Sequence, residues 1–120
     1  MNELLIEFAA IIDTHTIEQE TGPGLKAIER CVFVFRDSSR LVTYESRKGS
    51  KFKFGYQWMS ATHQTIYRWD NTPHFPDFDT FPNHRHTGPE ELPEPFPAVS
   101  LADVLAFIAR HFAESPLISD

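Results

Sequence analysis

Seven of the nine prolines of this 120-residue chain fall between Asn71 and Val99. Each proline removes a backbone N–H donor and fixes φ, so this segment cannot be helix or sheet throughout. Regular structure is therefore expected before and after it, and the segment itself is expected to be a long loop across the surface. Because loops on a rigid scaffold often carry function, its polar residues are the first place to look for chemistry.

The length of the chain allows about one domain with a single core. We expect this domain to span residues 1–113, with residues 114–120 as a C-terminal tail. Cys31 is the only cysteine and has no partner for an internal disulfide. No apolar run approaches the roughly 20 residues of a membrane span, and the N-terminus lacks the basic region of a secretory signal. The sequence predicts a cytoplasmic protein with no membrane association.

The residues before the prolines alternate as strands do. The clearest case is 52–58, where four aromatic residues alternate with Lys53, Gly55 and Gln57. Since successive side chains of a strand point to opposite faces, the aromatic face is expected in the core and the other face is expected to be polar. Together with the apolar run 31–35, this pattern predicts an antiparallel sheet. Five strands are expected, over residues 12–20, 28–36, 41–45, 52–58 and 65–70.

Helical spacing occurs at both ends of the chain. Apolar residues between Leu4 and Ile12 share one helical face and predict a helix over residues 2–10. Ser100, followed three residues later by Asp103, resembles a capping box and begins a second apolar stripe that ends at Phe112. The predicted fold is α+β: a sheet of about five strands, an N-terminal helix, a long Pro/His-rich loop, and a C-terminal helix packed on the sheet.

Charge is distributed unevenly along the chain. The whole sequence carries a net charge of −6, whereas residues 26–53 hold eight Lys or Arg residues and only three Asp or Glu residues. Such a basic segment on an acidic body would bind phosphate or an acidic partner. The alternative is that the charges discourage pairing between exposed strand edges.

Three of the six histidines lie close to Asp70 in the motif Arg-Trp-Asp-Asn-Thr-Pro-His, residues 68–74, and the motif His-Arg-His, residues 84–86. Metal-free RNA cleavage needs a base, an acid and a cation near the phosphate, and histidines with an arginine supply all three at neutral pH. Here His74 and His86 would be the acid–base pair, Asp70 would orient an imidazole, and Arg68 or Arg85 would hold phosphate.

Two other interpretations of the same residues remain open. His-x-His on an extended segment places both rings on one side, so His74, His84 and His86, with Asp70, would suit a divalent transition metal. Alternatively, Asp70 and Asn71 fix a turn, and the histidines bind backbone carbonyls as part of the scaffold.

Residues 68–86, read as Arg-Trp-Asp-Asn-x-Pro-His-x-Pro followed by Thr-Phe-Pro-x-His-x-His, resemble the signature of the TumE-type toxin family of toxin–antitoxin systems. The order of helices and strands is similar too. The resemblance implies a toxin whose partner is a helix-turn-helix antitoxin, and a ribonuclease activity. Members often carry a histidine flanked by aromatic residues and followed by Gln in the preceding strand, where this chain reads Phe54-Gly55-Tyr56-Gln57, with Gly55 in place of the histidine.

The leading hypothesis is therefore a TumE-like toxin that acts on RNA without a metal cofactor. The alternative is a non-catalytic binding or metal-carrying module whose His-rich loop is an interaction surface. A basic groove is expected from Lys51 and Lys53 to the loop, and a homodimer is expected from the exposed sheet edge. The catalytic residues are expected to be Arg68, Asp70, His74, His84 and His86. The substrate-binding residues are expected to be Lys53, Gln57, Trp69, Asn71 and Arg85.

Overall fold

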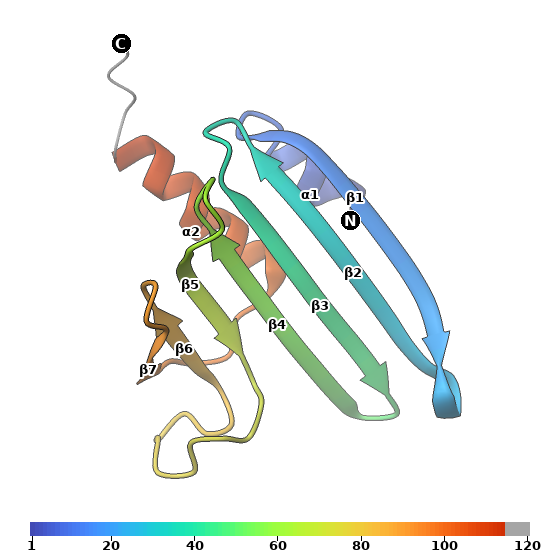
Figure 1. Ribbon diagram of the computed structural model, residues 1–120. Coiled ribbons are helices and arrows are strands. Elements are labelled where there is room, and N and C mark those ends of the chain that lie inside the picture. The colour runs from blue at the N-terminus through green and yellow to red at the C-terminus, as the bar shows by residue number, and fades with distance from the viewer. Residues whose placement is uncertain (115–120) are drawn as a thin grey trace.

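The computed structural model describes residues 1–114, in which one antiparallel sheet carries a helix near each end of the chain (Figure 1). Most of the proposed tail, residues 115–120, lies outside the described residues. The elements are α1 (Asn2–Glu7), β1 (Ile12–Gly22), the 3-10 turn η1 (Pro23–Leu25), β2 (Lys26–Phe35), β3 (Arg40–Lys48), β4 (Lys51–Met59), β5 (Thr65–Asp70), β6 (His84–Thr87), β7 (Leu92–Pro95) and α2 (Leu101–Glu114).

The sheet is a meander of seven strands in the order β1 to β7, each paired antiparallel with the next. The expectation of about five strands was wrong, because β6 and β7 lie inside the proline-rich segment. Proline is tolerated in an edge strand, which needs backbone donors on one side only. Pro93 and Pro95 occupy β7, whose one partner is β6. The four residues of β6 fit between Pro82 and Pro89.

One face of the sheet, here called the helix face, forms the core with α1 and α2. The register places Phe33 opposite Leu41, and Leu41 opposite Trp58, and all three are buried. From α2, Phe107 contacts Trp58, Tyr67 and Trp69, with ring centroids 5.2 to 6.3 Å apart. The aromatic face of β4 is therefore in the core, as the alternation predicted. Figure 1 shows both helices behind the sheet and the long β1–β4 strands extending beyond them.

Both helices follow the apolar pattern, with one difference in length. The α1 helix ends at Glu7, whereas a helix to residue 10 was expected; Phe8 and Ile11 are nevertheless buried, in the turn that leads into β1. The Ser100 hydroxyl accepts the Asp103 N–H at 3.1 Å, and the Asp103 carboxylate accepts the Ser100 N–H at 2.9 Å. This reciprocal pair begins α2 as a capping box does. Neither helix of residues 1–114 is long and apolar enough to span a membrane.

The opposite face of the sheet, here called the open face, carries Lys53, Gly55 and Gln57 of β4 and their partners in neighbouring strands. Both described helices pack on the other face. Strand alternation assigns six of the eight basic residues of segment 26–53 to the open face. They are Lys26, Arg30, Arg40, Lys48, Lys51 and Lys53.

Candidate functional site

Four of the five expected catalytic residues meet on the open face because two short strands are paired. Arg68 and Asp70 alternate in β5, His84 and His86 alternate in β6, and the register sets Arg68 opposite His86 and Asp70 opposite His84. Alternate residues of paired strands share a face, so this register alone brings the four side chains together. We call Asp70, His84 and His86 the central cluster.

Asp70 lies next to both imidazoles of the central cluster. Its Oδ1 accepts the Thr72 N–H at 2.9 Å and lies 3.0 Å from His84 Nε2. Its Oδ2 accepts a hydrogen bond from Arg68 Nη1 at 2.7 Å and lies 3.9 Å from His86 Nε2. The carboxylate is therefore held in place by one backbone donor and one guanidinium, and both imidazoles approach it.

Backbone carbonyls fix the tautomers of both imidazoles. His84 Nδ1 lies 3.0 Å from the Pro82 carbonyl oxygen, and His86 Nδ1 lies 2.9 Å from the Glu91 carbonyl oxygen. A carbonyl oxygen only accepts, so each Nδ1 must carry the proton and donate it. In the neutral rings, each Nε2 then carries a lone pair and faces Asp70.

The central cluster is buried. Asp70, His84 and His86 are 4%, 2% and 8% exposed. Their ligand atoms lie within 4.8 Å of one another, and within residues 1–114 no other group of three such side chains converges in this way. His84 Nε2 lies 3.0 Å from Asp70 Oδ1, yet it makes no hydrogen bond within the described residues.

The proline-rich loop covers the central cluster with aromatic rings. The Phe75 ring lies 4.8 Å from that of His84 and 5.9 Å from that of His86, and Phe78 stacks on Phe75 at 5.0 Å. His74 precedes Phe75 but is exposed, and its ring lies 6.3 Å from Phe75. The structure therefore places His74 at the outer side of this cover, apart from the other two histidines of the motif.

Glu91 is part of the site, and sequence reasoning missed it. Its carboxylate accepts hydrogen bonds from Arg68 Nε at 2.9 Å and from the Thr65 hydroxyl at 3.0 Å. Burial would raise the pKa of Glu91, but these hydrogen bonds and the charge of Arg68 together lower it. Arg68 is thus held between Asp70 and Glu91. No spacing in the sequence points to Glu91, which lies in the turn between β6 and β7.

Three expected substrate-binding residues lie on or beside the open face. Lys53 is exposed there, and Gln57 donates to the Thr65 hydroxyl at 2.8 Å. Asn71 is held by the backbone of β4: its Oδ1 accepts the Phe54 N–H at 3.0 Å, and its Nδ2 donates to the Phe52 carbonyl at 2.8 Å. Asn71 thereby fixes the point at which the chain leaves β5.

The other two expected substrate-binding residues lie on the helix face. Trp69 is 2% exposed and packs against Phe107. Arg85 lies between the rings of Tyr67 and Phe96, at 4.4 and 4.2 Å, and donates to Glu94 at 2.6 Å. Strand alternation explains both positions. Each of the two residues lies in the sequence between two residues of the site, so its side chain points to the opposite face of the sheet.

Gly55 lies opposite Asp70, in the same row as His84. A Cβ added at Gly55 would lie 3.9 Å from Asp70 Cβ, which is ordinary van der Waals contact. A larger residue therefore has room to begin at this position, on the open face beside the central cluster. In this chain the position contributes no side chain.

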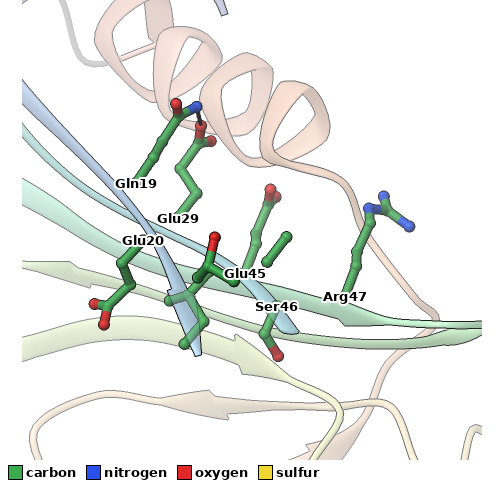
Figure 2. Close-up of a pocket in the computed structure, with 9 residues that line it drawn as sticks. Gln19, Glu20, Glu29, Glu45, Ser46 and Arg47 are labelled. Carbon is green, nitrogen blue, oxygen red and sulfur yellow. Dashed lines mark hydrogen bonds between the residues drawn. The ribbon is translucent and has the colours of Figure 1, made fainter. Parts of the chain in front are cut away.

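A hollow of about 490 Å³ lies away from the central cluster, over the ends of β1, β2 and β3 that carry Glu20, Ile28 and Ser46. Figure 2 shows Gln19, Glu29, Glu45 and Arg47 rising from the sheet on the same side, towards α2. Glu29 accepts a hydrogen bond from Gln19 at 2.7 Å, and Glu45 accepts one from the Tyr56 hydroxyl at 2.5 Å. Burial and this bond to Glu45 raise the pKa of Tyr56.

The fold and the site define a small α+β protein with a buried carboxylate–imidazole cluster at one end of an antiparallel meander. The chain matches the family model described as toxin TumE over residues 1–112. It therefore belongs to the TumE toxin family, which confirms the resemblance of residues 68–86 and makes it a toxin component. Comparison with curated proteins and with solved structures gave no match.

Proposed function

We propose that this toxin cleaves RNA at the central cluster, with Arg68 binding the phosphate. The observation that carries the proposal is the position of the cluster at the end of a face that gathers six basic residues of segment 26–53. Lys53 and Gln57 of β4 connect that basic surface to Asp70 and Arg68 of β5. An anionic strand bound along the open face would therefore run into the site.

The open face has the two features that single-stranded RNA binding uses. Lysines and arginines attract the phosphate backbone, and an exposed aromatic ring can stack on a base. Tyr44 supplies a half-buried ring on this face beside Arg30, whose guanidinium lies 5.4 Å from the ring centroid. Lys51 and Lys53 lie on this same face. The expected basic groove from these lysines to the proline-rich loop requires that position.

The central cluster supports phosphodiester cleavage by acid–base chemistry. A neutral imidazole with a free Nε2 lone pair is the form that accepts a proton, here from a 2′-hydroxyl. The Arg68 side chain is 33% exposed and would contact the negative charge that develops on the phosphate. Because Phe75 covers both imidazoles, RNA must displace this ring or enter beside it. This route needs no metal; His74, at the outer side of the cover, would contact the substrate.

A helix-turn-helix antitoxin is the proposed partner, and the proposed place of action is the cytoplasm. A homodimer is proposed from β1, an edge strand of eleven residues whose outer backbone groups have no partner strand in the described chain. A non-catalytic toxin that binds its target through the loop is the alternative activity.

Growth of a bacterial host tests the toxin proposal. Expression of the chain should arrest growth, and co-expression of a helix-turn-helix protein encoded beside it should restore growth. His84→Ala and His86→Ala should each abolish arrest at equal protein level, whereas His15→Ala, an exposed histidine of β1, should leave it unchanged. Arrest that persists in both cluster variants would overturn the assignment of the site.

A further inference from the structure

We infer that Asp70, His84 and His86 bind one divalent transition metal ion through two Nε2 atoms and one carboxylate oxygen. This inference rests on the proposed RNA cleavage at the central cluster and goes beyond its metal-free route, because it names a cofactor for that site. It also changes the role of the imidazoles from proton acceptors to ligands.

The first support is the orientation of the two rings. Histidine ligands usually donate their second ring N–H to a carbonyl or carboxylate, which fixes the tautomer and turns the lone pair towards the metal. Both rings here have that arrangement, through the Pro82 and Glu91 carbonyls. The two carbonyls belong to different turns, on either side of β6, so the chain is folded to hold both rings the same way.

The second support is a repulsion between His84 and Asp70 that a bound cation would remove. His84 Nε2 is buried, has no hydrogen bond, and lies 3.0 Å from Asp70 Oδ1. A neutral Nε2 lone pair and a carboxylate oxygen repel each other at this distance, and burial removes the water that would screen them. An ion bound to both atoms converts the repulsion into two favourable contacts.

The third support is the size and charge of the site. One ion can reach all three ligand atoms after small shifts, because they lie within 4.8 Å of one another. Arg68 lies close by, but its charge is shared between Asp70 and Glu91, at 2.7 and 2.8 Å. With neutral histidines, the charges of Asp70, Glu91 and Arg68 leave the site with a formal charge of −1.

The donor set indicates the class of ion. Two imidazole nitrogens and one carboxylate oxygen suit Zn²⁺, Mn²⁺ or Fe²⁺ and are too few oxygens for Ca²⁺. Three protein ligands leave coordination positions free, as in catalytic sites. An ion of this kind supplies a Lewis acid for a phosphate oxygen and lowers the pKa of bound water.

Calorimetric titration of the purified full chain with Zn²⁺ and with Mn²⁺, after dialysis against a chelator, tests this inference. We expect one equivalent of at least one of these ions to bind. Asp70→Asn and His86→Gln should each weaken binding by more than about a hundredfold, since ligands contribute more than their outer partners. His15→Gln, which removes an imidazole far from the cluster, should bind as the unchanged chain does.

A second measurement does not depend on variants that fold. Addition of Co²⁺ to the unchanged chain should produce visible absorption bands of a bound ion, and one equivalent of Zn²⁺ should displace them. Absence of stoichiometric binding would overturn the metal site, and so would a loss of metal affinity in His15→Gln equal to that in the cluster variants. RNA cleavage measured in the presence of a chelator tests the proposed function separately. Stoichiometric binding without any RNA cleavage would support the site and contradict the ribonuclease.

Discussion

Asn71 connects the site to the core through two hydrogen bonds with the backbone of β4. We predict that Asn71→Ala lowers the free energy of unfolding by about 2 kcal/mol, because each of these partly buried hydrogen bonds contributes about 1 kcal/mol. Urea denaturation measures the change. Asn83→Ala is the control, since within the described residues the Asn83 side chain makes no hydrogen bond. A loss equal to that of Asn83→Ala would show that the two bonds contribute nothing.

Each residue of the central cluster was expected from the sequence, but the aromatic ring of Phe75 that covers the cluster was not. Arg68 and Asp70 alternate in a strand, and His84 and His86 do the same, so a shared polar face follows once the two strands pair. Glu91 and Phe75 come from turns whose direction depends on tertiary contacts. For the same reason the position of His74, outside the Phe75 ring, could not be predicted from its spacing in the motif.

At the scale of elements, β2 and β3 set two carboxylates opposite each other. Glu29 pairs with Glu45 across the strands, and neither makes a salt bridge within residues 1–114. Like charges at directly paired positions are destabilising. We predict that Glu29→Gln stabilises the protein by about 0.3 to 0.5 kcal/mol at low salt, and by less at high salt because counterions screen the repulsion.

Thermal unfolding at two salt concentrations measures this effect. Glu18→Gln is the matched control, because Glu18 lies opposite Arg30 and loses an attraction instead of a repulsion. It should leave stability unchanged or lower it slightly. Equal stabilisation by both changes would mean that total charge, and not the Glu29–Glu45 pair, is responsible.

The elements that were predicted correctly are those with a long, regular pattern. The strand expected over 65–70 has the bounds Thr65–Asp70, and each of the four strands before it is one to four residues longer than expected. The two strands that were missed are four residues each and lie between prolines. A pattern of four residues cannot be distinguished from a loop in the sequence. Pairing at the edge of the sheet determines that these residues form strands.

At the scale of the whole molecule, most basic residues of segment 26–53 lie on one face of the sheet. The open face carries Lys51 and Lys53, whereas Arg47, in the adjacent strand, lies on the helix face with its guanidinium 4.1 Å from the centroid of Phe52. Local potential rather than the net charge of −6 governs the approach of an anion. The sequence located the basic segment; only the register showed to which face each cation belongs.

We predict that Lys53→Gln weakens binding of single-stranded RNA about threefold to tenfold and lowers the salt slope by about 0.7, the amount for one phosphate contact. Arg47→Gln removes the same charge on the opposite face and should have a smaller effect. Fluorescence anisotropy with a labelled oligonucleotide at several salt concentrations measures both. Equal losses for the two variants would contradict an RNA path along the open face.

The central claim is that the cluster of Asp70, His84 and His86 is the active centre of this toxin. Cleavage of single-stranded RNA by the purified chain tests it most directly, with His86→Gln and His15→Gln prepared and checked for folding in the same way. We predict cleavage by the unchanged chain and by His15→Gln, and a rate at least about a hundredfold lower for His86→Gln, the range for loss of a catalytic acid–base group. Equal rates for all three proteins would contradict the claim.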